Sequence, residues 1–181
     1  MINLFKPIIL CLAYTLKLMY GYEGLNILLR ITPSQISIFI LRFFGATIGK
    51  NVRIQTPVLI HNADKSKNIF SNLNIGNECY IGRDCIIDLM GVIEIGNNVT
   101  ISHRAILNTH TNAGKSPVSK KRLKNSVGHI SISDGTYLGL NVTVLESVSI
   151  GENCIVGANS LVNDDLPDNV IAYGVPCTVR G

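Results

Sequence analysis

The chain has 181 residues, of which 15% are charged, and its formal net charge is +4. This length allows one domain with a substantial core. The modest charge, without any groove-reading motif, argues against nucleic acid as a partner. Five cysteines without a C-x-x-C pair indicate neither a disulfide framework nor a zinc site, and this use of cysteine is typical of a reducing cytoplasm.

Residues 2–20 form an apolar segment that contains Lys6 and Lys17. Its uninterrupted apolar run is shorter than the ~20 residues that a membrane span needs, and no small-residue cleavage site of a secretory signal follows it. We expect an amphipathic helix that packs on the rest of the protein or on a neighbouring subunit. The alternative is peripheral contact of residues 1–30 with the inner face of a membrane.

A second helix is predicted to begin at Thr32, with Thr32 as N-cap, Pro33 in the first helical position and Gln35 completing a capping box. Apolar residues then follow on one face, and Gly45 can end the helix in a left-handed conformation. We expect residues 1–46 to form a helical cap over the open end of whatever follows.

An aliphatic residue recurs at every sixth position from Ile132 to Val162. A helix would need apolar spacings of three and four, and a half-buried strand would need alternation. A period of six instead indicates a solenoid in which six residues form one short strand and a turn, and three such units close a triangular coil. The sequence therefore predicts a mainly β fold, a parallel β-helix of hexapeptide repeats.

The same period of six appears earlier in the chain, in sets of three that begin at Ile48, Ile75 and Ile95. Together the sets predict about five coils over residues 47–166, followed by a tail, 167–181. The phase slips between sets, so extra residues must leave the coils at three places: 61–74, 88–94 and 108–131. Cysteines replace small aliphatic residues at one coil position and are expected to fill the core: Cys79, Cys85 and Cys154.

The insertion 108–131 is long for a regular solenoid, and such a loop is uncommon unless it has a function. It carries five basic residues: Lys115, Lys120, Lys121, Arg122 and Lys124. Two interpretations stay open, a solvated loop and a contact with an anionic ligand.

Stacking the coils places equivalent residues in columns. One column is expected to contain His103, Leu140 and Ala158. Another, on an outward face, is expected to contain Asp88, Asn108, Leu145 and Asn163.

His110 is the strongest candidate among the four histidines, because it lies where the regular coil meets the irregular insertion. A neutral imidazole at such a place suits a general base. Asp88 or Asn108 could orient its other ring nitrogen, and the columns are too coarse to choose between the two. Single histidines are more often structural, which is the expectation for His61, His103 and His129.

Three stretches resemble one known family. YLGLNVTVLESVSIGENCIVGANSLVNDDLPDNVIAYGVPCTVRG is similar to the closing coils and tail of the hexapeptide-repeat acyltransferases, and VTISHRAILNTHTN is similar to the coil that brings in their catalytic histidine. TPSQISIFILRFFGATIGKNVRI resembles the start of the subgroup that O-acetylates cell-surface polysaccharides. The resemblance implies a left-handed solenoid, although most parallel crossovers are right-handed.

The resemblance also implies a homotrimer with acetyl-CoA in the groove between neighbouring solenoids. Its pantetheine would lie along Gly139, Leu140 and Ala158. Its nucleotide end would lie near Asn163, Asp164 and Arg180, and the basic insertion could contact its phosphates. His110 would take a proton from the acceptor hydroxyl as that oxygen attacks the thioester, with backbone N–H groups stabilising the oxyanion. Neither a metal nor an acyl-enzyme is implied.

The implied function is therefore acetyl-CoA-dependent O-acetylation of a sugar in a surface polysaccharide or its lipid-linked precursor, in the cytoplasm or at the inner face of the membrane. One alternative acceptor is a small free molecule, such as a simple sugar, serine or an antibiotic. A non-catalytic trimeric scaffold is another alternative. A carbonic-anhydrase-type enzyme would need three converging histidines, and the spacing of seven between His103 and His110 does not match its histidine pair.

Overall fold

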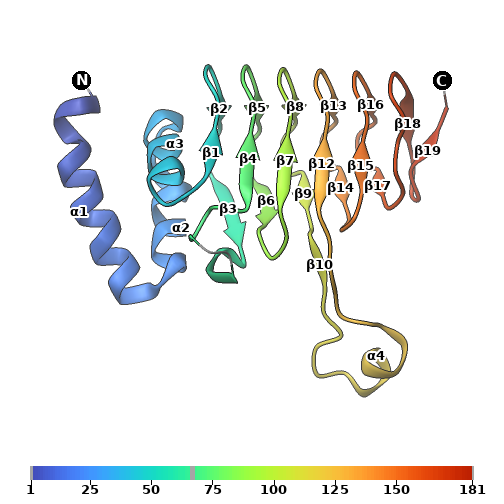
Figure 1. The fold of residues 1–181 in the computed structure, drawn as a ribbon, viewed down its shortest axis with the longest axis horizontal. Helices are drawn as coiled ribbons and strands as arrows, with labels where there is room; N and C mark the ends of the chain where they lie inside the picture. Colours follow the sequence, from blue (N-terminus) through green and yellow to red (C-terminus); the bar gives the residue numbers. More distant parts are fainter. Residues whose placement is uncertain (1, 66–67, 181) are drawn as a thin grey trace.

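The computed structural model describes residues 2–65 and 68–180, and most of them form a solenoid of three parallel sheets (Figure 1). The first sheet contains β1 (Thr47–Ile48), β4 (Leu73–Ile75), β7 (Ile93–Ile95), β12 (Ile130–Ile132) and β15 (Ser149–Ile150). The second contains β2 (Arg53–Ile54), β5 (Tyr80–Ile81), β8 (Thr100–Ile101), β13 (Tyr137–Leu138), β16 (Ile155–Val156), β18 (Ile171–Tyr173) and the antiparallel β19 (Thr178–Val179). The third contains β3 (Val58–His61), β6 (Cys85–Asp88), β9 (Ile106–Leu107), β14 (Thr143–Val144) and β17 (Leu161–Val162).

The aliphatic residues of the six-residue period stack in register and form the core. In the third sheet Ile87 lies beside Leu107, which lies beside Val144, and all three are buried. The second sheet repeats this pattern. Because each of the first and third sheets has five strands, the prediction of about five coils is confirmed.

The corners of the coils explain two other features of the repeat. At most corners the third residue after the aliphatic position adopts a left-handed φ, for example 59° at Asn141 and 60° at Asn159, and asparagine accepts this conformation readily. Glycine follows the aliphatic position where coils approach closely: a Cβ at Gly139 would lie 2.7 Å from the Ala158 nitrogen. The cysteines predicted to fill the core are buried, as expected: Cys79, Cys85 and Cys154.

Three helices cap the N-terminal end of the solenoid: α1 (Ile2–Tyr20), α2 (Tyr22–Ile31) and α3 (Ser34–Phe43). α3 packs against β1 and β2, and α1 packs against α2 and α3 as the outermost layer (Figure 1). Gly45, with φ 117°, ends α3 as predicted, because the Gly45 and Ala46 nitrogens donate to the carbonyls of Arg42 and Leu41.

The predicted capping box at Thr32 is wrong. The residue that precedes α3 is Pro33, and no side chain caps this helix. Thr32 instead ends α2, where its Oγ1 donates to the Leu28 carbonyl at 2.8 Å. Only two residues separate α2 from α3, and the Thr32 hydroxyl group hydrogen-bonds to the end of α2.

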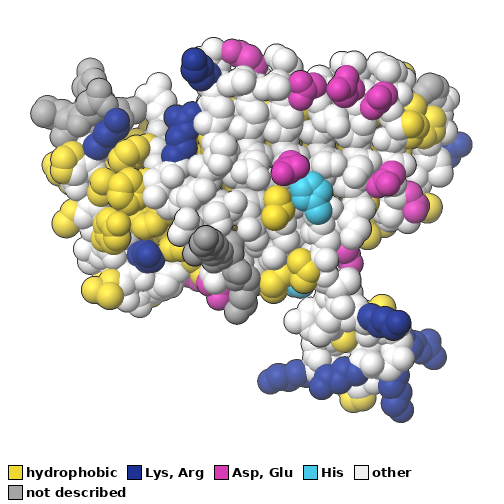
Figure 2. Space-filling model, in the orientation of Figure 1, with side chains coloured by type: hydrophobic (Ala, Val, Ile, Leu, Met, Phe, Trp, Pro, Cys, Tyr) yellow, Lys and Arg dark blue, Asp and Glu magenta, His cyan; other side chains and the backbone are white. Residues whose placement is uncertain are grey.

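α1 presents two different faces. Ala13 is fully buried on the inner face, where the Tyr14 ring contacts Phe43 and Phe44 edge-on. The outer face is apolar and exposed, and Figure 2 shows apolar side chains gathered at this end of the molecule. Among the residues described, no helix is long and apolar enough to cross a membrane.

The insertion 108–131 is an ordered arm and not the irregular loop that the sequence suggests. β10 (His110–Thr111) and β11 (Ser126–Val127) pair as an antiparallel hairpin, and the short helix α4 (Pro117–Arg122) lies near its tip. The arm projects from the side of the solenoid (Figure 1). The excursion 61–74 similarly contains a short 3-10 helix, η1 (Ala63–Lys65), before β4 begins.

Candidate active site

Asp88 lies at the end of β6, where the chain leaves the regular coil, and it is only 2% exposed. Two neighbours supply three donors to its carboxylate: Asn62 Nδ2 donates to Oδ1 at 2.6 Å, and the Thr109 nitrogen and hydroxyl donate to Oδ2 at 2.9 and 2.7 Å. The expectation that Asp88 would face outward is therefore wrong. The residues that follow β3 and β9 donate to the carboxylate, which lies buried between them.

The surroundings of Asp88 favour its ionised form. Burial by itself would raise the pKa of this carboxyl, but hydrogen bonds from Thr109, His110 and Asn62 outweigh burial and lower the pKa below its ordinary value. Asp88 is thus a buried carboxylate whose charge is balanced by donors from the coils on either side.

His110 completes this cluster from β10, one coil further along. Its Nδ1 lies 2.7 Å from Asp88 Oδ2, and its side chain is 19% exposed. Because an ionised carboxylate can only accept, Nδ1 must carry the proton in this hydrogen bond. When the ring carries this single proton, Nε2 keeps a free lone pair, which is the arrangement that a general base requires.

The structure separates the two candidate partners of His110. Asp88 contacts the ring, whereas the Asn108 side chain donates to the His110 backbone carbonyl at 2.7 Å. Asn108 thus holds the main chain at this position and does not contact the ring. Thr109 and Asn62 could not be identified from the sequence. Thr109 is simply the residue before His110, Asn62 lies one coil before Asp88, and neither belongs to a recognisable motif.

His110 lies at a shallow pocket of about 230 Å³ formed where the arm joins the solenoid. Its lining combines β10, β11, the adjoining arm residues and Met90 from the preceding coil: Met90, His110, Thr111, Asn112, Asn125, Ser126 and Val127. A ligand that reaches His110 through this pocket must contact the base of the arm.

Glu146, which the sequence did not single out, joins the two strands of the arm. Its Oε1 accepts from Thr111 Oγ1 on β10 at 2.7 Å and from Ser126 Oγ on β11 at 2.9 Å. Burial would raise the pKa of this carboxyl, but the Thr111 and Ser126 hydroxyls, a backbone donor and the nearby His110 lower it. A second carboxylate therefore fixes the strand that carries His110.

The remaining histidines make other contacts, although His61 lies beside Asp88 in the register of β3 and β6. His103 Nδ1 accepts from the Arg83 nitrogen at 3.0 Å, and His129 Nε2 lies 3.4 Å from Glu94 Oε2. His61 is exposed at the end of β3. Across the residues that the structure describes, no group of three acidic, histidine or cysteine side chains could hold a metal ion.

The six residues predicted to bind coenzyme A lie at three places on the chain. Leu140 and Ala158 follow β13 and β16 in adjacent coils, as the column argument predicted, and the Asn159 nitrogen donates to the Leu140 carbonyl at 2.8 Å. Gly139 shares this corner. Asn163 and Asp164 follow β17, at the opposite end of the third-sheet strands, and Arg180 in the tail lies over the Tyr173 ring at 5.5 Å. A single chain does not gather all six into one pocket.

Comparisons with known proteins give the family. Residues 129–164 match the family described as bacterial transferase hexapeptide (six repeats). A galactoside O-acetyltransferase of Lactococcus lactis subsp. lactis (strain IL1403) is 31% identical over 150 residues, 83% of this chain and 69% of the relative. A putative colanic acid biosynthesis acetyltransferase of Escherichia coli (strain K12) is 34% identical over 141 residues, 78% of this chain and 71% of the relative. A solved galactoside acetyltransferase in complex with coenzyme A superposes with a TM-score of 0.74 at 26% identity, covering 88% of this chain and 77% of the other.

The chain belongs to the hexapeptide-repeat acetyltransferases, since two relatives above 30% identity are matched over more than two thirds of their length. The solenoid is the left-handed β-helix of that family, and the predicted fold class is confirmed. The predicted enzyme class, an acyltransferase, is confirmed as well.

Proposed function

We propose that this protein transfers the acetyl group of acetyl-CoA to a hydroxyl group of a surface-polysaccharide sugar or its precursor. The observation that carries the proposal is the His110–Asp88 pair, 2.7 Å apart, at the pocket beside the arm. The matched relatives support the chemistry, because their names give acetyl transfer to galactosides and a role in colanic acid biosynthesis. A free sugar is the alternative acceptor, favoured by the galactoside relative.

In the proposed reaction, His110 Nε2 removes the proton of the acceptor hydroxyl while that oxygen attacks the thioester carbonyl. The tetrahedral intermediate then expels the coenzyme A thiolate, which takes the same proton back from Nε2. Asp88 holds the ring in the reactive tautomer and stabilises the transient imidazolium, as the carboxylate of a catalytic triad does. The transfer is direct, without an acyl-enzyme.

Acetyl-CoA would lie between two copies of the chain in a homotrimer. Gly139, Leu140 and Ala158 would contact its pantetheine, and the tail would contribute Arg180. Exposed apolar residues on adjacent second-sheet strands support an interface: Tyr137 pairs with Ile155, and Ile155 pairs with Ile171. Because the predicted ligand residues lie at separate corners, a neighbouring copy would be needed to complete the site.

A peripheral membrane contact through α1 is a further part of the proposal. Its support is the uncharged outer face, where Ile8, Leu12 and Met19 are exposed. Co-sedimentation with anionic vesicles tests it: Leu12→Glu should reduce binding if α1 meets the bilayer, and equal sedimentation of the two proteins would refute the contact.

The function is tested by comparing wild type with His110→Ala and Asp88→Asn in acetyl transfer from acetyl-CoA to a panel of glycosides, followed by thiol release. His110→Ala should lower kcat by about 10²- to 10⁴-fold, the usual contribution of a general base. In Asp88→Asn the amide can donate to Nδ1 and so favour the tautomer that protonates Nε2, with a loss of similar size.

Binding of coenzyme A serves as the control, because neither variant changes the residues proposed to contact it. Equal turnover by His110→Ala and wild type would eliminate His110 as the base. Wild-type protein that binds no coenzyme A and releases no thiol would favour the non-catalytic scaffold.

A further inference from the structure

The arm concentrates the positive charge of the whole molecule. We define the basic arm as residues 112–125, which contain five Lys or Arg residues and no Asp or Glu: Lys115, Lys120, Lys121, Arg122 and Lys124. Since the chain carries a net +4, all the residues outside the basic arm together carry −1. Figure 2 shows these cations clustered on the arm, apart from the solenoid.

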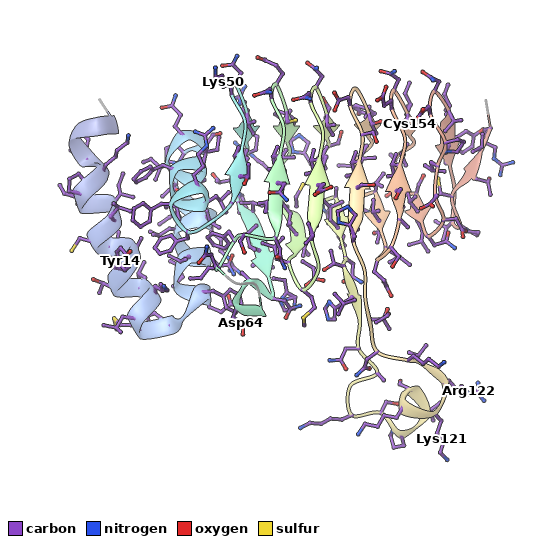
Figure 3. The ribbon with its side chains drawn as sticks, viewed as in Figure 1. Tyr14, Lys50, Asp64, Lys121, Arg122 and Cys154 are labelled. Carbon is purple, nitrogen blue, oxygen red and sulfur yellow. The ribbon has the colours of Figure 1, made fainter. Side chains whose placement is uncertain are left out.

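These cations are free to meet a ligand. All five residues are exposed, and none forms an ion pair with a carboxylate of the residues that the structure describes. Figure 3 shows Lys121 and Arg122 directed outward from the arm. A cluster of like charges within ten residues costs stability through self-repulsion, and an anionic ligand of more than one charge would relieve that cost.

The basic arm is also directly connected to the candidate active site. Its two ends continue β10 and β11, where His110 pairs with Val127, and Glu146 fastens both strands. Asn112 and Asn125 of the arm line the pocket at His110. A molecule whose hydroxyl group sits at His110 and whose anionic part extends outward would therefore follow the arm.

We infer that the basic arm is the anion-binding half of the acceptor site, and that the acceptor is a sugar carrying a diphosphate group. This inference rests on the proposed function, because it takes His110 as the site of transfer. Several lysines suit a diphosphate, which offers multiple charges and many acceptor oxygens in a small volume. The diphosphate can belong to a nucleotide-linked or to a lipid-linked sugar. The residues predicted to contact the nucleotide end of acetyl-CoA lie outside the arm, after β17 and in the tail, so we assign the arm to the acceptor.

The test is equilibrium binding of inorganic pyrophosphate, UDP-galactose and coenzyme A to three full-length proteins by calorimetry. They are wild type, an arm variant in which Lys120, Lys121 and Arg122 become alanine, and a control in which Lys50, Arg53 and Arg83 become alanine. Both variants lose three exposed cations, and alanine preserves the helical propensity of α4. The arm variant should bind pyrophosphate and UDP-galactose at least about tenfold more weakly, while the control variant and coenzyme A binding stay unchanged.

Three results would overturn the inference. Wild type that binds neither pyrophosphate nor UDP-galactose has no such site. If the arm variant loses affinity for coenzyme A but keeps its affinity for pyrophosphate and UDP-galactose, the arm binds the cofactor instead. Charge-dependent binding to phosphatidylglycerol vesicles, without binding of the soluble diphosphates, assigns the arm to a membrane.

Acetyl transfer to UDP-galactose and to a polyprenyl-diphosphate galactose in detergent micelles then separates the two sources of diphosphate. Binding is measured without acetyl-CoA turnover, and His110→Ala should bind pyrophosphate as wild type does. Failure of the proposed reaction is therefore distinguishable from failure of the arm as an anion site.

Discussion

At the scale of single residues, the candidate site depends on one buried carboxylate. Asp88 accepts hydrogen bonds from Asn62 in the preceding coil and from Thr109 and His110 in the next. A buried charge is costly unless it is paired and hydrogen-bonded, and here every donor also fixes the chain near the reactive ring. The same contacts thus provide stability and select the tautomer of His110.

The lowered pKa of Asp88 predicts acid sensitivity. Its folded-state pKa lies below the ordinary ~3.9 expected when the chain is unfolded, so the ionised form contributes stability above that value. This contribution is lost as the pH falls below about 4 and through the folded-state pKa. We expect the free energy of unfolding, from urea titrations at a series of pH values, to fall more steeply in wild type than in Asp88→Asn below about pH 5. Parallel curves would contradict this expectation.

The position of a single residue could be predicted from the sequence where the six-residue period is interrupted. His110 stands where the six-residue period stops, and the structure places it at the junction of solenoid and arm. The choice between Asp88 and Asn108 depended on side-chain direction, which no spacing determines. Thr109 and Asn62 became relevant only when neighbouring coils were brought together.

At the scale of elements, the base of the arm is a hairpin held from outside by Glu146. The hairpin has two residues in each strand, and such a short pair is not stable alone. The carboxylate bridge between Thr111 and Ser126 therefore fixes the position of the neighbouring His110.

This bridge leads to a prediction. Glu146→Ala should lower kcat by up to about 10²-fold through misplacement of His110, whereas Glu146→Gln, which keeps an acceptor oxygen, should lose less. Trypsin cleavage in the basic arm gives a second readout, because a loosened hairpin exposes its lysines to faster cutting. Unchanged cleavage and unchanged kcat in Glu146→Ala would show that the bridge does not position the histidine.

The cap illustrates a limit of local signals. Thr32, Pro33 and Gln35 mark the start of α3 to within one residue, yet the Thr32 hydroxyl group donates back to the Leu28 carbonyl and hydrogen-bonds forward to Ser37 Oγ. The motif located the boundary between α2 and α3 but predicted the wrong hydrogen bonds for Thr32. The reason is that the apolar sequence before Thr32 gave no sign that a separate helix, α2, ends there.

At the scale of the whole molecule, the second sheet exposes an apolar column that a lone chain leaves in water. Ile155 is 47% exposed between Tyr137 and Ile171. Contact between copies would bury this column, as the proposed homotrimer requires.

Light scattering on purified protein tests the assembly. Wild type should have the mass of three 19.7 kDa chains, about 59 kDa. Ile155→Lys should shift the protein toward monomer, since a charge buried in an apolar interface is costly. Ile31→Lys is the matched control, because Ile31 is 74% exposed and belongs to α2 of the helical cap, not to the second sheet. A wild-type mass of one chain, or an Ile155→Lys protein that stays trimeric, would contradict the interface.

The sequence by itself determined the solenoid, because a period of six repeats one local geometry and each coil packs only on its neighbours. It also determined the place of His110, because the six-residue period stops where the chain leaves the coil for the insertion. Only the tertiary structure decided that Asp88 is buried against His110, that Glu146 joins the strands of the arm and that the insertion is an ordered hairpin. These features depend on side-chain directions between residues many positions apart, which stacking the coils fixes and sequence spacing does not.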